Sequence, residues 1–221
     1  MIHIAIDGPA GSGKSTIAKK VANQLNIKYL DSGALYRIIG YYFKEIINSL
    51  EETTIKENLK DIEITLEDNH YILNDEKINQ QIRKAESGNF ASIVAKIPEV
   101  RNKVNEILRK ISDKMSTVID GRDIGTVVLP DAEYKFFLTA SAQERAERRY
   151  NELIGKGENV DYDLILKEIQ QRDYNDSNRK IAPLKPAKDA IEIDTTKKYI
   201  EEVLKEIMKH IDGDYNEGKN S

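Results

Sequence analysis

The chain has 221 residues, with 34 lysines and arginines against 38 aspartates and glutamates and no cysteine or tryptophan. This length suffices for one domain with a real core, or for one domain with an insertion. The absence of cysteine excludes disulfides, thiolate metal sites and a cysteine nucleophile, and three scattered histidines leave little for a histidine-based metal cluster. A net charge of -4 argues against a generic nucleic-acid binder.

No apolar stretch approaches the roughly 20 residues needed to span a bilayer, and residues 1–7 are wrongly flanked for a signal peptide. We therefore expect a soluble, cytoplasmic protein that binds neither membranes nor nucleic acids. Its chemistry must use lysine, arginine, aspartate, serine and backbone groups.

Short apolar runs alternate with helical patterns along the chain. The runs lie at 2–7, 27–31, 117–120, 134–138 and 190–194, and helical spacing is found at 15–25, 101–111, 141–153, 162–174 and 198–211. This alternation predicts βαβ units, and hence an α/β fold with a mostly parallel sheet covered by helices on both faces. Ligands of such sheets gather at the carboxyl ends of the strands.

One segment breaks this alternation. Residues 62–82 show period-two apolar spacing with turn signals at Asp68-Asn69 and Asn74-Asp75, which predicts a small antiparallel meander. Before it, residues 54–57 (Thr-Ile-Lys-Glu) have the pattern of a capping box for a short helix. A polar excursion at 155–161 is a candidate lid, and the apolar-poor segment 212–221 is expected to fray.

One glycine-rich segment predicts a nucleotide triphosphate site, because it matches G-x-x-x-x-G-K-[ST] between a predicted strand and a predicted helix. Its residues are Gly8, Pro9, Ala10, Gly11, Ser12, Gly13, Lys14, Ser15 and Thr16. The backbone N–H groups and the helix N-terminus would bind phosphates, Lys14 would reach the β- and γ-phosphates, and the Ser15 hydroxyl could bind Mg²⁺. Asp120 ends an apolar strand and could hold Mg²⁺ directly or through water, or simply cap the next turn.

The phosphate-binding loop leaves three classes open: a regulatory GTPase, a mechanical ATPase and a small-molecule kinase. A GTPase needs N-K-x-D, and the one Asn-Lys, at Asn102-Lys103-Val104-Asn105, lacks the aspartate. Mechanical ATPases usually need a longer chain for their partner-binding domains. A kinase for a small anionic acceptor fits this length best.

Nine of the ten arginines fall in or beside candidate site segments, and only Arg109 lies on an ordinary helix face. Planar guanidinium groups bind phosphate oxygens bidentately. Arg145 and Arg149 repel each other at i,i+4, although Glu144 can pair with Arg148, so a solvated charged face is the alternative. Arg172, Asp176 and Arg179 recur at i, i+4 and i+7 and would share one helix face. That face is either a salt-bridge ladder or a clamp for a sugar and a phosphate.

No histidine is placed to act as a general base. A phosphate acceptor needs none, since its second pKa of about 6 leaves it largely deprotonated at neutral pH. The missing base is thus consistent with transfer from phosphate to phosphate, in which catalysis consists of positioning and charge neutralisation.

Four segments accompany the phosphate-binding loop: residues 30–37 (LDSGALYR), 120–128 (DGRDIGTVV), 171–179 (QRDYNDSNR) and 182–184 (APL). Together with the loop, they resemble the bacterial cytidylate kinases, the (d)CMP kinases among the nucleoside monophosphate kinases. The resemblance runs in order from about residue 2 to 211. It implies transfer of the γ-phosphoryl of ATP to CMP or dCMP with Mg²⁺, by a protein that we expect to be monomeric. A monophosphate kinase that prefers UMP, or a nucleotide switch that binds a protein partner, is the alternative.

The resemblance implies a P-loop monophosphate kinase fold with five parallel strands, a small antiparallel insertion and a helical lid. We expect one kinase unit over residues 1–221, whose parts are a core at about 1–55, 100–143 and 175–211, an acceptor-binding insertion at 56–99, a lid at 144–174 and a frayed tail at 212–221. Carried over by matching positions, the acceptor ligands are Ser32, Arg37, Arg83, Ser92, Arg101, Arg122, Asp123, Arg172, Asp176 and Arg179.

Roles can be sorted provisionally by chemistry. Asp123 can accept from the exocyclic amine of cytosine, with Arg101 and Ser92 at its O2 and N3. Uracil would set a carbonyl against that carboxylate and lose about 1–3 kcal/mol or more. Asp176 and Arg172 would meet the sugar, and Arg37, Arg122 and Arg179 the acceptor phosphate. The predicted catalytic cations are Lys14, Arg122, Arg148, Arg149 and Arg172, with Arg145 a third candidate from the lid; the predicted metal ligands are Ser15 and Asp120.

Overall fold

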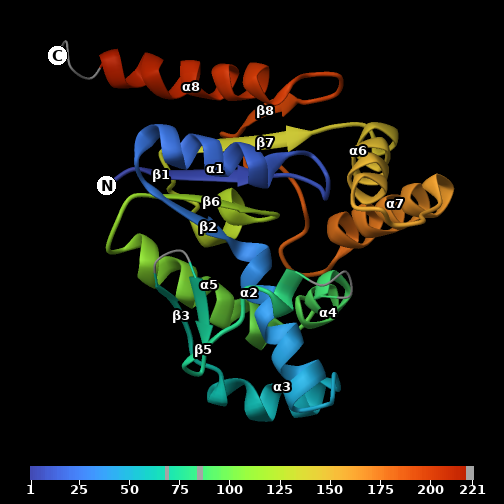
Figure 1. Ribbon diagram of the computed structural model, residues 1–221. Helices are drawn as coiled ribbons and strands as arrows, with labels where there is room; N and C mark the ends of the chain where they lie inside the picture. Colours follow the sequence, from blue (N-terminus) through green and yellow to red (C-terminus); the bar gives the residue numbers. More distant parts are fainter. Residues whose placement is uncertain (68–69, 84–86, 218–221) are drawn as a thin grey trace. The chain divides into compact units, whose positions relative to one another are not determined.

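The first of two units of the chain contains a five-stranded parallel sheet (Figure 1). Its strands lie in the order β2 (Lys28–Asp31), β6 (Thr117–Gly121), β1 (His3–Asp7), β7 (Tyr134–Thr139) and β8 (Ile191–Asp194). The computed structural model describes residues 1–67, 70–83 and 87–217. Its first unit comprises residues 1–30 and 115–221, and its second comprises residues 31–114. Within the described residues, no helix is long and apolar enough to cross a bilayer.

The first unit follows the predicted alternation of strands and helices. Its elements are β1 (His3–Asp7), α1 (Lys14–Leu25), β2 (Lys28–Asp31, whose last residue belongs to the second unit), β6 (Thr117–Gly121), the π-helical turn η4 (Ile124–Val128), β7 (Tyr134–Thr139), α6 (Ala142–Gly155), α7 (Tyr162–Asn178), β8 (Ile191–Asp194) and α8 (Ile200–Glu217). The five apolar runs of the sequence are therefore confirmed as the five strands of the sheet.

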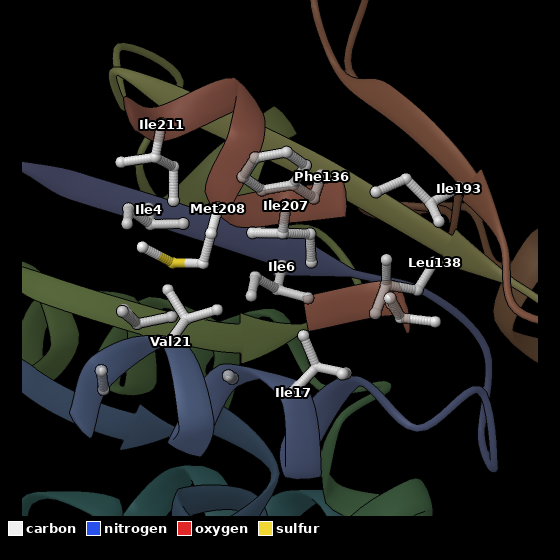
Figure 2. Close-up of a cluster of buried hydrophobic side chains, with 14 residues drawn as sticks. Ile4, Ile6, Ile17, Val21, Phe136, Leu138, Ile193, Ile207, Met208 and Ile211 are labelled. Carbon is white, nitrogen blue, oxygen red and sulfur yellow. The ribbon is translucent and has the colours of Figure 1, made fainter. Parts of the chain in front are cut away.

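The core of this unit lies between the sheet and the helices α1 and α8 (Figure 2). Ile4 and Ile6, which share one face of β1, are fully buried there, together with Phe136 and Leu138 of β7. Ile207 of α8 is fully buried in the same cluster. Ala5 points to the other face of β1 and is fully buried as well, so both faces of this central strand are covered. Burial on both faces explains why these strands read as continuous apolar runs.

Helices α6 and α7 form a pair that follows the carboxyl end of β7 (Figure 1). Ala146 and Leu153 of α6 pack against Ile165 and Ile169 of α7 in a small apolar cluster. The predicted polar excursion is the connection between the two helices, which begins after Gly155. This pair occupies the segment predicted to be a lid.

The second unit contains the predicted antiparallel meander. Its elements are α2 (Ser32–Tyr41), the π-helical turn η1 (Tyr42–Ile46), α3 (Glu52–Asn58), the 3₁₀ turn η2 (Leu59–Asp61), β3 (Ile64–Glu67), β4 (His70–Leu73), β5 (Glu76–Lys77), the 3₁₀ turn η3 (Gln81–Arg83), α4 (Ser87–Val94) and α5 (Pro98–Ser112). The strands pair in the order β3-β4-β5. Asn74 and Asp75 adopt φ values of 45° and 69°, as the tight turn between β4 and β5 requires. The other turn signal, Asp68-Asn69, lies outside the described residues.

Three local predictions differ from the structure. The short helix α3 exists, but the capping box at residues 54–57 is wrong, because Glu51 is the N-cap and Thr54 lies inside the helix. Arg179 follows the last residue of α7 and has an extended backbone, so it does not continue the face of Arg172 and Asp176. Helix α8 extends to Glu217, six residues into the segment expected to fray.

Candidate functional site

The loop between β1 and α1 has the backbone of a phosphate cradle. Gly13 is the N-cap of α1 with a φ of 85°, a left-handed conformation that a side chain would strain. A Cβ on Gly8 would lie 2.2 Å from the Leu138 carbonyl oxygen, so only glycine fits where the loop leaves the sheet. Lys14 is buried, and its Nζ donates to the Pro9 carbonyl at 3.2 Å. A loop of this shape presents N–H groups and one ammonium to an anion.

Ser15 and Asp120, the predicted metal ligands, are in direct contact. The Ser15 hydroxyl donates to Oδ2 of Asp120 at 2.7 Å, and the Tyr29 hydroxyl donates to Oδ1 at 2.6 Å. Asp120 is 2% exposed at the end of β6. A hydroxyl and a carboxylate held together beside the phosphate cradle are the oxygen donors that Mg²⁺ prefers, so the residues present fit this ion. Among the described residues, no cluster of three acidic, histidine or cysteine side chains forms a separate metal site.

Asp7, at the carboxyl end of β1, holds the turn that follows β6. Its two carboxylate oxygens accept from the backbone N–H groups of Ile124 and Gly125 at 2.9 and 2.8 Å. Burial raises the pKa of Asp7 from 3.8 to about 7, against the lowering effect of these two hydrogen bonds. The side chain is 4% exposed. Asp7 therefore fixes the start of η4, directly after Arg122 and Asp123.

Four predicted acceptor ligands form two reciprocal ion pairs. Nε of Arg122 donates to Asp176 at 2.9 Å, and Nη2 of Arg179 lies 3.2 Å from Oδ1 of Asp123. Each pair joins the segment after β6 to the carboxyl end of α7, so neither is a ladder along one helix. Asp123 is 5% exposed and the other three are part-buried. Cross-pairing between two segments orients these four groups relative to one another.

The guanidinium of Arg145 is buried, and it joins the phosphate-binding loop to α7. Its Nη1 donates to the Ala10 carbonyl of the phosphate-binding loop at 3.0 Å, and its Nε donates to the Ala140 carbonyl at 2.9 Å. Asp173 of α7 binds both terminal amino groups, at 3.0 and 2.5 Å. The repulsion expected between Arg145 and Arg149 is thus compensated for Arg145 by Asp173, within the protein.

Arg148 and Arg149 have different surroundings. Arg148 binds Glu144 at 3.1 Å and Thr195 through both terminal amino groups. Arg149 pairs with Glu152 at 2.9 Å, and its side chain is 42% exposed. Between these two predicted catalytic cations, Arg148 is the one that the structure ties to a neighbour of the phosphate-binding loop.

The remaining predicted ligands are distributed over both units. In the first unit, Arg172 is exposed on α7. In the second unit, Arg37 pairs with Asp31 at 2.7 Å, and Arg101 is 3% exposed with its guanidinium carbon 5.6 Å from the centre of the Tyr36 ring.

Two serines and one arginine complete the second unit's set. Ser32 begins α2 and is buried, and the Ser92 hydroxyl donates to the Gly88 carbonyl within α4. Arg83 ends η3, and its side chain lies outside the described part of the chain.

Three residues of the first unit's site were not singled out from the sequence: Asp7, Tyr29 and Thr195. Asp7 carried a signal, since it ends an apolar run just before the glycine-rich loop, as Asp120 ends another. To find Tyr29 from the sequence, one would have to know that β2 lies beside β6. To find Thr195, one would have to know that the residue after β8 reaches the loop after β1. No pattern local to either residue indicates such contacts.

Comparison with known proteins gives a consistent result. A family model described as Cytidylate kinase matches residues 4–213. The cytidylate kinase of Thermosipho melanesiensis is 53% identical over 208 residues, covering 94% of this chain and 95% of that protein. That of Clostridioides difficile is 50% identical over 209 residues, covering 94% and 97%. An uncharacterized protein from Eubacterium ventriosum has a solved structure with a TM-score of 0.54 at 19% identity, covering 96% of this chain and 99% of that one, a likeness of fold alone.

Proposed function

Since the chain belongs to the cytidylate kinase family, we propose that it transfers the γ-phosphoryl group of ATP to CMP or dCMP and releases ADP with CDP or dCDP. Family membership makes the chain a phosphotransferase that acts on cytidylate, so a nucleotide switch without turnover is no longer an alternative. We propose in addition the donor, the range of acceptors and the residues that act on each.

The donor is assigned to the loop between β1 and α1. Residues 8–16 would surround the β- and γ-phosphates with N–H groups, and Lys14 would leave the Pro9 carbonyl, to which it now donates, for a phosphate oxygen. Ser15 and Asp120 would hold Mg²⁺, directly or through water. The ion, when bound, neutralises charge that develops on the phosphate oxygens.

The acceptor phosphate is assigned to arginines, and no general base is required because the nucleophilic oxygen is already deprotonated at neutral pH. Arg122 is suited to this role: Asp176 engages its Nε and the Gly121 carbonyl its Nη1, while a guanidinium has five N–H donors in all. Arg179 would share the phosphate, and Arg37 stays a predicted ligand of it. Arg172 and Asp176 would contact the sugar, and Arg148 and Arg149 would approach the transferring group from α6.

The observation that carries the proposal is the pair of reciprocal ion pairs between Arg122 and Asp176 and between Asp123 and Arg179. A salt-bridged group loses less conformational freedom when its ligand arrives. Preorganised cations aimed at developing charge are a major source of catalysis in phosphoryl transfer. In the second unit, Ser32, Arg83, Ser92 and Arg101 stay predicted acceptor ligands.

We expect wild-type enzyme to phosphorylate CMP and dCMP faster than UMP, AMP and GMP, because Asp123 accepts from the cytosine amine and repels a carbonyl. A coupled assay of ADP release with the five acceptors measures this. Equal kcat/KM for CMP and UMP would contradict the role of Asp123 and favour a kinase with another base preference.

Replacing Asp123 by alanine should lower kcat/KM for CMP by about 10- to 100-fold and leave that for UMP within a few-fold, since the lost contact is specific to the amine. Asp131→Ala removes an exposed carboxylate from the turn before β7 and should change neither value. If Asp123→Ala fails to fold in circular dichroism, the ion pair with Arg179 is its main role; if it folds and the CMP to UMP ratio is unchanged, Asp123 does not read the base.

We also propose that the enzyme acts in the cytoplasm, where its nucleotide substrates are produced and consumed. Its predicted monomeric state stays a prediction, which light scattering of the purified chain would test.

A further inference from the structure

Thr195 lies at a junction between three segments of the first unit. It follows the last residue of β8 and is 3% exposed. Its hydroxyl lies 2.9 Å from the Thr139 carbonyl at the end of β7 and 3.2 Å from the Ser12 carbonyl in the phosphate-binding loop. Its backbone N–H also donates to the Thr139 carbonyl, at 2.8 Å. Thr195 is thereby fixed to the sheet and to the loop at once.

Arg148 binds this junction with both terminal amino groups. Nη1 donates to the Thr195 hydroxyl oxygen at 3.2 Å, and Nη2 donates to the Thr195 carbonyl at 2.6 Å. Glu144 holds the same guanidinium from one turn earlier on α6, at 3.1 Å. A Cβ placed on Gly13 would lie 4.0 Å from Nη1, so the guanidinium lies beside the glycine that begins α1.

We propose that Thr195 is a positioning residue: it holds the Arg148 guanidinium at the phosphate-binding loop, where that cation can act on the group being transferred. The inference rests on the proposed role of Arg148 in phosphoryl transfer. A threonine hydroxyl has one donor and two acceptor lone pairs, so it can donate to a carbonyl of the loop or the sheet while it accepts from the arginine. Valine has the same shape without either function.

This arrangement explains why a flexible arginine on α6 would be in place before the nucleotide binds. An arginine side chain loses considerable rotamer freedom when it is fixed, and two hydrogen bonds to one residue offset that cost in advance. The carbonyl contact depends on backbone position alone. The hydroxyl contact depends on the side chain at residue 195, and substitution can therefore isolate it.

The test is a double-mutant cycle in the full-length enzyme with CMP and ATP as substrates. Thr195→Val should lower kcat about five- to tenfold and leave KM for CMP within about twofold, because Arg148 is not assigned to the acceptor. Thr195→Ser, which keeps the hydroxyl, should restore kcat to within about twofold of wild type. In an Arg148→Ala background, Thr195→Val should have no further effect on kcat beyond about twofold.

Thr196→Val is the matched control, since the neighbouring hydroxyl accepts from the Ser141 N–H and does not contact Arg148. It should leave kcat within twofold. An equal loss of kcat on Thr195→Val with and without Arg148 would overturn the inference, as would an unchanged kcat in Thr195→Val or in Arg148→Ala.

A second measurement is independent of catalysis and of the substrate assignment. In arginine-labelled protein, the guanidinium signals of Arg148 should show slowed exchange with water and hindered rotation in wild type and in Thr195→Ser. Both effects should weaken in Thr195→Val. Identical signals in wild type and Thr195→Val would refute the positioning role even if the protein proved inactive on CMP, whereas inactivity with the expected signals would count against the proposed function only.

Discussion

Replacing Lys14 by alanine should lower kcat for transfer from ATP to CMP by about 1,000-fold, the size expected when the cation that stabilises a transferring phosphoryl is removed. Lys14 is buried in the loop, and its Nζ lies 3.2 Å from the Pro9 carbonyl, so its ammonium needs only to exchange this carbonyl for a phosphate oxygen. The backbone N–H groups remain in the variant, so ATP should still bind, with a KM that rises less than kcat falls.

Lys20→Ala is the control for this experiment. Lys20 lies on the same helix, its side chain is 43% exposed, and its weak pair with Glu201 at 3.6 Å contributes little. Its replacement should leave kcat within twofold. Steady-state kinetics and a thermal unfolding curve for each variant are the measurements; a Lys14→Ala enzyme that folds and keeps more than a tenth of wild-type kcat would remove Lys14 from the catalytic set.

The parallel sheet could be predicted from the sequence because each of its strands is a short apolar run, and helical patterns or polar turns separate these runs from one another. Period-two spacing likewise identified the meander, and Asn74-Asp75 its turn. The capping box at residues 54–57 failed because a four-residue pattern is satisfied equally well inside a helix as at its start. The tertiary fold, which begins α3 after Glu51, decides between the two.

The phosphate-binding loop could be predicted because all its chemistry is local: nine consecutive residues supply the glycines, the lysine and the serine. The arginines show the opposite case. Arg145, Arg148 and Arg149 lie on one helix within five residues, and their spacing gives no reason to separate them. Their contacts separate them: Arg145 binds Asp173, Arg148 binds Thr195 and Arg149 binds Glu152. Asp173 and Thr195 are distant in the sequence from the arginines that they bind.

Raising the pH from 4 to 8 should reduce the free energy of unfolding of the wild-type chain relative to Asp7→Asn by up to about 4 kcal/mol. Asp7 is 4% exposed, and burial raises its pKa from 3.8 to about 7 in the folded chain. Below about pH 4 the carboxyl is protonated in both the folded and the unfolded chain. Between the unfolded pKa of 3.8 and the folded pKa of about 7, only the unfolded chain has lost the proton of Asp7. The free energy of unfolding that this protonated carboxyl contributes is therefore fully present at low pH, falls across this range and is lost above about pH 7.

The asparagine variant isolates this effect because it cannot titrate at residue 7, whereas every other ionisable group is common to both proteins. Its amide oxygen can accept from Ile124 or Gly125, and its amide nitrogen would face the other N–H, which adds a penalty that does not depend on pH. The difference between the two unfolding free energies should therefore have a constant offset and a slope confined to about pH 4–7. A difference that stays flat across this range would show that the two backbone N–H groups compensate the burial of Asp7 and keep its pKa near 3.8. In that case, the turn that presents Arg122 and Asp123 would be held by a full carboxylate at every pH at which the enzyme works.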